Sequence, residues 1–82
     1  MTDADVIDLV RGALIEAKPQ LADELGDLGL DTRFETIRMD SLDTLKMITV
    51  LEDRLGCVLE GDDLSKVSTV RDLGDLLREM SS

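Results

Sequence analysis

The stretch DSLDTLKMITVLEDRLG, residues 40–56, decides the fold of this chain. Its apolar residues recur at spacings of three and four, which indicates one face of an amphipathic helix. They are Leu42, Leu45, Ile48, Leu51 and Leu55, with Met47 and Val50 widening the stripe. Asp40 or Ser41 can cap the start of this helix, and Gly56 fits the position just past its end. We therefore expect a helix whose Leu45, Ile48 and Leu51 face the core.

A second apolar stripe lies upstream. It consists of Val6, Ile7, Val10, Ala13, Leu14 and Ala17. Thr2, followed three residues later by Asp5, resembles a capping box with Asp in place of Glu. Pro19 disfavours helical geometry at Lys18 and should end this element. The first helix is therefore expected to occupy the segment between Thr2 and Lys18.

A third stripe lies downstream and consists of Val70, Leu73, Leu76, Leu77 and Met80. Ser68 or Thr69 is placed to cap this last helix. Residues 62–67 could form one short helix before it. Residues 18–40 read mostly as a long loop, in which Leu21, Leu25 and Leu28 could make a helical turn or two and the later apolar residues tuck onto the bundle.

No segment alternates with period two for long enough to suggest a sheet. The fold class predicted for residues 1–82 is therefore all-α, a single-domain four-helix bundle. It should have three main helices, one short helix and a long loop between the first and second helices. Only one of its 82 residues, Phe34, is aromatic, so the core must be aliphatic.

The net charge of -10 is spread along the chain: residues 1–40 carry 10 acids and 4 bases, and residues 41–82 carry 9 acids and 5 bases. Such a surface repels phosphate backbones, so we expect no nucleic-acid partner. It favours basic protein partners and fast, salt-sensitive encounters, although solubility alone would also explain it.

Several other kinds of protein are disfavoured. There is no histidine, which removes the commonest general base and metal ligand. Cys57 is the single cysteine, so no disulfide can form within the chain, and we expect it to be a small buried hydrophobe. No apolar stretch could span a membrane, and the first residues do not resemble a signal peptide. A cytoplasmic monomer is the expectation.

Ser41 is the residue most open to chemistry. It stands where a long loop meets a helix, so its hydroxyl should be exposed. A phosphate attached there would face unpaired backbone amides and the positive end of the helix dipole. From spacing alone, a plain helix cap is the favoured interpretation of Ser41. A hydrolase nucleophile needs an adjacent base, and Lys46 lies on a different face of the helix, so another protein would have to activate Ser41.

The run from Asp40 to Val70 resembles the second half of an acyl carrier protein. The similarity rests on Asp40-Ser41-Leu42-Asp43-Thr44-Leu45, on the striped helix ending at Gly56, and on Asp62-Asp63-Leu64-Ser65-Lys66-Val67-Ser68-Thr69-Val70. The first 35 residues match that family only in helix order. The resemblance is to a family of non-enzymatic carriers.

The resemblance implies that Ser41 receives phosphopantetheine from coenzyme A, transferred by a separate phosphopantetheinyl transferase that needs magnesium. Asp40 would help to position that metal in the complex; the chain itself holds no metal site. Leu42 and the acidic residues Asp43, Glu52 and Asp53 would dock on basic patches of the transferase and of the acyl-loading, condensing and processing enzymes. The interior could shelter a short acyl chain if the helices part.

Some positions depart from the family pattern. Arg38 stands where the family usually has Gly, so the loop approach to Ser41 is expected to differ. Lys46 replaces a Glu, and Thr49 a bulkier apolar residue, of fatty-acid carriers. Both lie on the helix that partner enzymes recognise in that family, so Lys46 is also expected to meet those enzymes. These changes favour a polyketide-type or other specialised pathway over housekeeping fatty-acid synthesis. The alternatives are a peptidyl or aminoacyl carrier, an acidic interaction module without a prosthetic group, and, on the acids Glu60, Asp62 and Asp63, a calcium-responsive protein.

Overall fold

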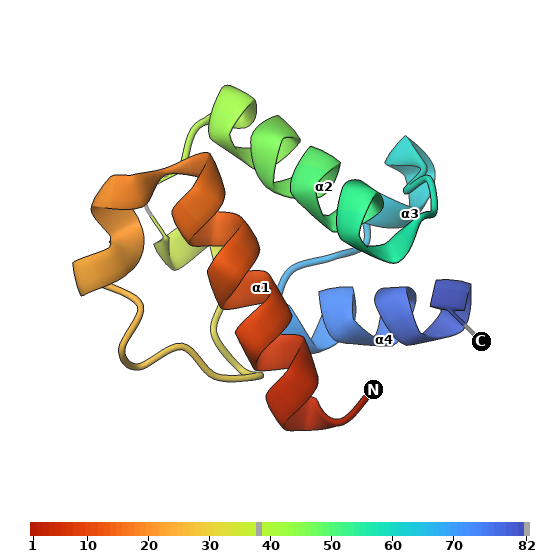
Figure 1. Ribbon diagram of the computed structural model, residues 1–82, viewed down its shortest axis with the longest axis horizontal. Coiled ribbons are helices and arrows are strands. Elements are labelled where there is room, and N and C mark those ends of the chain that lie inside the picture. Colours follow the sequence, from red (N-terminus) through yellow and green to blue (C-terminus); the bar gives the residue numbers. More distant parts are fainter. Residues whose placement is uncertain (38, 82) are drawn as a thin grey trace.

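A computed structural model describes residues 1–37 and 39–81 of the chain. Three long helices form the body: α1 (Asp3–Ala17), α2 (Ser41–Leu55) and α4 (Val70–Ser81). The four-residue helix α3 (Gly61–Leu64) connects α2 to α4, and two 3-10 turns, η1 (Pro19–Asp23) and η2 (Phe34–Thr36), lie in the long loop. The predicted all-α four-helix bundle is confirmed (Figure 1).

The helix boundaries follow local rules that the sequence displays. Thr2 caps α1, because its hydroxyl accepts the Asp5 N–H while the Asp5 carboxylate accepts the Thr2 N–H. Helix α1 ends at Ala17, two residues before Pro19. Helix α2 ends at Leu55, and the next residue, Gly56, adopts a left-handed φ of 65° that a glycine takes without a steric penalty. The short helix α3 is briefer than the predicted span of residues 62–67.

The core is aliphatic, as the composition required. The largest fully buried side chains come from α1, η1, α2 and α4: Val6, Val10, Leu14, Leu21, Leu51, Val70, Leu73 and Leu77. Helices α1 and α4 approach closely because Gly74 has no side chain. A Cβ built at Gly74 would lie 2.6 Å from Cγ1 of Val6, so a larger residue there would force the helices apart.

One prediction about α2 is wrong. Leu45 was expected to face the core, but 61% of it is exposed. Met47 and Leu51 are the buried residues of this helix, and Ile48 is half-buried against the core. The stripe is therefore rotated toward Met47, which shares an apolar cavity with Phe34 of the long loop and Leu73 of α4.

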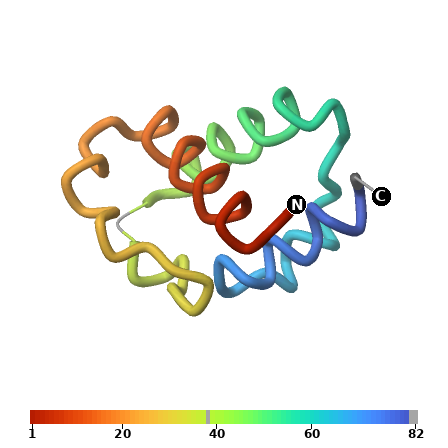
Figure 2. Tube along the Cα trace, turned by 60° about the horizontal axis from the view of Figure 1, so that its bottom comes forward, coloured from red at the N-terminus to blue at the C-terminus, as the bar shows by residue number. Residues whose placement is uncertain are grey.

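Ion pairs between helices fix their relative positions. The Arg54 guanidinium of α2 passes over Gly12 and pairs with the Glu16 carboxylate of α1 at 2.8 Å. Arg78 near the end of α4 pairs with Asp3 at the start of α1 at 2.6 Å. Figure 2 shows the consequence, with the N-terminus beside the last turns of α4.

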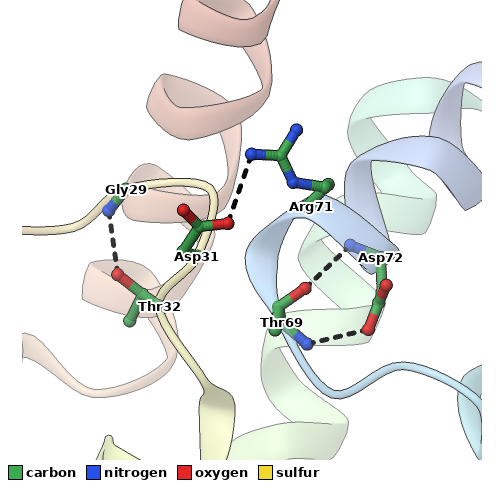
Figure 3. Close-up of polar contacts among 6 residues, drawn as sticks. All are labelled: Gly29, Asp31, Thr32, Thr69, Arg71 and Asp72. Carbon is green, nitrogen blue, oxygen red and sulfur yellow. Dashed lines mark hydrogen bonds and ion pairs between the residues drawn. The ribbon is translucent and has the colours of Figure 1, made fainter.

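The long loop is fastened to the start of α4 (Figure 3). The N–H groups of Val70 and Arg71 donate to the carbonyls of Thr32 and Leu30, at 3.0 and 2.8 Å, and Arg71 also pairs with Asp31 at 3.2 Å. Arg33 and Thr69 form an isolated antiparallel bridge; the described residues contain no longer strand. These contacts hold residues 30–33 of the long loop against the start of α4.

Thr69 is the residue that caps α4. Its hydroxyl accepts the Asp72 N–H at 3.1 Å, and the Asp72 carboxylate accepts the Thr69 N–H at 3.2 Å (Figure 3). The same carboxylate accepts the Ser68 N–H at 3.0 Å. These two donors lower the pKa of Asp72, the Ser68 N–H having the larger effect. The fold therefore favours the ionised form of the Asp72 carboxylate at the start of α4.

Candidate functional site

Ser41 is the first residue of α2, and its neighbour Asp40 is the cap. The Asp40 carboxylate accepts the Asp43 N–H at 2.8 Å, and the Asp43 carboxylate accepts the Asp40 N–H at 3.4 Å. The sequence left the choice between Asp40 and Ser41 open, and the structure assigns the cap to Asp40. Capping the helix therefore does not occupy the Ser41 hydroxyl.

The Ser41 side chain is exposed, and its hydroxyl makes no hydrogen bond within the described residues. The backbone N–H groups of Ser41 and Leu42 lie in the first turn, where no preceding helical carbonyl can accept them. They add their polarity to the positive end of the helix dipole. A phosphodiester on the Ser41 oxygen fits this position chemically, since it would be accessible, lie near unpaired donors and displace no structural hydrogen bond.

An apolar patch adjoins Ser41. Leu42 and Leu45 are 60% and 61% exposed. They line an open groove between the end of α1 and the outer face of α2, together with Glu16, Ala17, Lys46, Thr49 and Val50. Two exposed leucines one turn apart, beside an unused hydroxyl, are typical of a protein-binding surface rather than of a core.

The four residues expected to meet partner proteins differ in their freedom. The Asp43 side chain is only 16% exposed, helps to cap α2 and pairs with Lys18 at 3.7 Å. The Glu52 carboxylate accepts the Leu59 N–H at 2.8 Å and so ties the following loop to α2. Asp53 and Lys46 are exposed, and no intramolecular ion pair engages either of them within the described residues.

A second, more enclosed space lies on the other side of α2. Phe34 of the long loop, the α2 residues Thr44, Met47 and Ile48, and Leu64, Val67 and Leu73 from the chain beyond it line a mainly apolar cavity of about 100 Å³. Its walls come from four different segments, so small movements of α3 or of the loop would change its volume. The sequence pointed to an interior shelter without identifying these residues.

The structure also places Cys57, which was expected to be buried, and the acids considered for calcium. Cys57 is only half-buried, because it follows α2 in the exposed connection to α3 and lies outside the core cluster. The acids Glu60, Asp62 and Asp63 lie around α3; within residues 1–37 and 39–81, no group of three potential ligands is arranged to hold a metal ion. The expectation about Arg38 falls outside the described residues.

Lys18 and Arg54 are the residues near the site that sequence reasoning overlooked. Lys18 pairs with Asp43 at the start of α2, and Arg54 with Glu16 at the groove. Both pairs join residues far apart in the chain, so no local spacing could have indicated them. In the part of the chain that the structure describes, no helix is long and apolar enough to cross a membrane.

Comparison with known proteins agrees with this geometry. Residues 16–77 match the profile of the family described as "Phosphopantetheine attachment site". The chain is 29% identical over 68 residues to "Acyl carrier protein 1, chloroplastic" of Casuarina glauca, covering 83% of this chain and 49% of that protein. It is 25% identical over 67 residues to "Acyl carrier protein 2, chloroplastic" of Spinacia oleracea, covering 82% of this chain and 51% of that protein. The chain thus spans about half the length of these curated relatives.

Proposed function

Because this chain belongs to the phosphopantetheine-binding family of acyl carrier proteins, whose prosthetic group is held covalently on a serine, we propose that Ser41 is the attachment residue. The observation that carries this assignment is an exposed Ser41 hydroxyl at the first position of a helix that Asp40 already caps, with no hydrogen bond to any other described residue. Members of the family are carriers and not enzymes, so the chain is assigned no catalytic step.

The residues around Ser41 would serve the transfer of the arm. The unpaired N–H groups of Ser41 and Leu42 would face the phosphate. Asp40 keeps one carboxylate oxygen on the Asp43 N–H, which leaves the other for the magnesium of the transferase complex. When bound, phosphopantetheine supplies a thiol that holds the acyl group as a thioester. Leu42 would contact the transferase and the enzymes that load, condense and process the cargo.

Electrostatics would bring those enzymes to the carrier. A net charge of -10 on an 82-residue chain attracts basic docking surfaces and accelerates association, an effect that salt screens. Of the acids first expected at the interface, Asp53 is free to make such contacts, whereas Asp43 and Glu52 are already engaged within the fold. We therefore assign Asp53 the direct charged contact that α2 makes with a basic partner, while Glu52 keeps its charge and adds to the long-range attraction.

The cavity beside Met47 and Ile48 is the proposed shelter for the start of an acyl chain. It is apolar, and it lies between α2, α3 and α4, where parting the helices would enlarge it. Its volume of about 100 Å³ suits a short aliphatic segment. Burial there would remove part of the chain from water while the thioester stays near Ser41.

The pathway proposed is a specialised, polyketide-type one rather than housekeeping fatty-acid synthesis. Lys46 and Thr49 support this, since both are exposed on the outer face of α2 and both depart from the pattern of fatty-acid carriers. A peptidyl cargo is disfavoured by Asp40, where peptidyl carriers often have His. A cytoplasmic monomer stays a prediction, because the relatives are named as chloroplast proteins.

The test is enzymatic attachment of the arm. Incubation with a promiscuous phosphopantetheinyl transferase, coenzyme A and magnesium should add one arm to the wild-type protein, as seen by intact mass. Ser41→Ala should stay folded by circular dichroism and remain unmodified. Ser65→Ala and Ser68→Ala, which change two other exposed serines, should be modified like the wild type. A wild-type protein left unmodified by several such transferases would refute the carrier proposal.

A further inference from the structure

The groove on the outer face of α2 is lined in part by a positively charged residue, Lys46. Six of the eight arginines and lysines that the structure describes take part in ion pairs; only Lys46 and Lys66 do not. Lys46 lies within the patch that Leu42, Leu45 and Val50 form. The same groove holds the two exposed leucines, the half-buried Val50 and the Glu16 carboxylate, so Lys46 is a cation in a partly apolar setting on a protein whose net charge is -10.

The carboxylates nearest to Lys46 are committed elsewhere. Glu16, which lines the same groove, pairs with Arg54 at 2.8 Å. Asp43, one turn before Lys46, pairs with Lys18 and accepts the Asp40 N–H. The residue one turn after Lys46 is the apolar Val50, so the helix offers no acid there for an i,i+4 pair. Within residues 1–37 and 39–81, the fold therefore gives Lys46 no ion-pair partner.

From this arrangement we infer that the groove binds partner enzymes that place an Asp or Glu carboxylate against Lys46 and an apolar side chain between Leu42 and Leu45. The inference rests on the proposed carrier function and specifies the partner. A carboxylate brought there would be partly shielded from water by the leucines, which strengthens a charge-assisted hydrogen bond. The rest of the partner surface would be basic, to match the acidic remainder of the carrier.

This mixed surface would provide specificity. A uniformly basic patch, suited to an acidic helix, would place like charge against Lys46, and like-charge contacts at an interface are costly. A partner with one acid in the correct place would be accepted, and a partner without it would be rejected. Lys46 would thus act as a selectivity residue without touching the thioester.

The experiment is a charge-swap cycle with a defined probe, a bacterial malonyl transferase of fatty-acid synthesis. Each basic residue around its active-site entrance is replaced singly by Glu. Catalytic efficiency is measured at low salt on the arm-bearing wild-type carrier and on Lys46→Glu. Lys66→Glu is the matched control, because it alters the other unpaired lysine and changes the net charge by the same amount.

We expect Lys46→Glu to be the better substrate of the unaltered transferase. At least one Glu variant of the enzyme should reverse this order, by roughly three- to tenfold, the range from an exposed contact to a partly buried one. Lys46→Arg should behave like the wild type, and Lys66→Glu should show no coupling to that enzyme variant. Amide chemical shifts on adding the enzyme variant should change at Leu42, Leu45 and Val50.

Failure of this inference can be told apart from failure of the carrier proposal, since attachment of the arm is checked by mass beforehand. If all combinations of carrier and enzyme are loaded alike, Lys46 carries no selectivity and the inference is wrong. The inference is also wrong if the amide chemical shifts change only on a face of the carrier other than this groove. It is wrong as well if those changes arise from association of two carrier molecules. If Leu45→Ser is loaded poorly but no enzyme variant shows charge coupling to Lys46, the groove is an apolar docking site. The proposal that a partner carboxylate contacts Lys46 would then be wrong.

Discussion

The two faces of α2 use similar side chains for opposite purposes. Toward α1 and α4, Met47 and Leu51 are buried and hold the bundle together. Toward the solvent, Leu42 and Leu45 are about 60% exposed beside the unused hydroxyl of Ser41. Hydrophobicity alone does not distinguish these leucines. The difference shows that one face of the helix packs into the core and the other is available for binding other proteins.

Replacing Leu51 by Ala should produce the largest effect. The side chain is fully buried, so its removal should lower the free energy of unfolding by about 2–5 kcal/mol, as other large-to-small core changes do. Leu45→Ala is the matched control and should change it by less than about 0.5 kcal/mol. Urea unfolding of both variants measures the contrast. Equal losses would show that the two faces are not distinct.

Glu52 and its neighbour Asp53 sharpen the comparison among charged residues. The Glu52 carboxylate accepts the Leu59 N–H, so Glu52→Ala should lower the free energy of unfolding by roughly 1–2 kcal/mol, about the value of a half-exposed charged hydrogen bond. Asp53→Ala should leave stability unchanged and instead slow association with the transferase at low salt. Stopped-flow binding at two salt concentrations, with thermal unfolding, separates these roles. The assignment is wrong if Asp53→Ala acts mainly on dissociation.

Leu42 tests the outer face directly. Leu42→Ala should lower the catalytic efficiency of arm attachment about fivefold or more, since exposed apolar anchors at interfaces are often worth over 1 kcal/mol. Its melting temperature should stay unchanged. Val58→Ala is the control, because Val58 is 72% exposed but lies in the connection after α2. An effect of Val58→Ala as large as that of Leu42→Ala would place the docking surface elsewhere.

The sequence predicted the elements better than their orientation. Thr2, Pro19 and Gly56 act through their immediate neighbours, so the helix boundaries could be inferred from local rules. The rotation of α2 could not, because stripes through Leu45 or through Met47 fit the same periodicity and only tertiary packing decides between them. The Lys18–Asp43 and Glu52–Leu59 contacts depend on tertiary structure and have no sequence signature.

The candidate site could be proposed from the sequence in more detail than its surroundings. Ser41 and Asp40 could be proposed because helix starts obey capping rules and because the motif resembles a known family. The groove at Leu45 could not be predicted, since it depends on how the end of α1 lies against α2. The lack of an ion pair at Lys46 could not be predicted either, since it depends on which acids Lys18 and Arg54 engage in the folded chain.

The smallest expected effect is a change in how stability depends on pH in acid. The pKa of Asp72 is lowered by the Ser68 and Thr69 N–H groups, and that of Asp5 by the Thr2 N–H and hydroxyl. A lowered folded-state pKa contributes stability that is present above the unfolded value of about 3.9 and is lost as the pH falls through the folded value. Asp72→Asn should therefore flatten the decline of melting temperature below about pH 4. An unchanged pH profile would show that this cap contributes nothing.

Mass spectrometry of the protein isolated from its own cells tests the central claim most directly. Fragmentation of the intact chain locates any covalent group to a residue. The account predicts one phosphopantetheine arm, on Ser41, with Ser65 and Ser68 unmodified and with acyl groups on the arm thiol during growth. A protein that carries no arm, or an arm on a different serine, would contradict it.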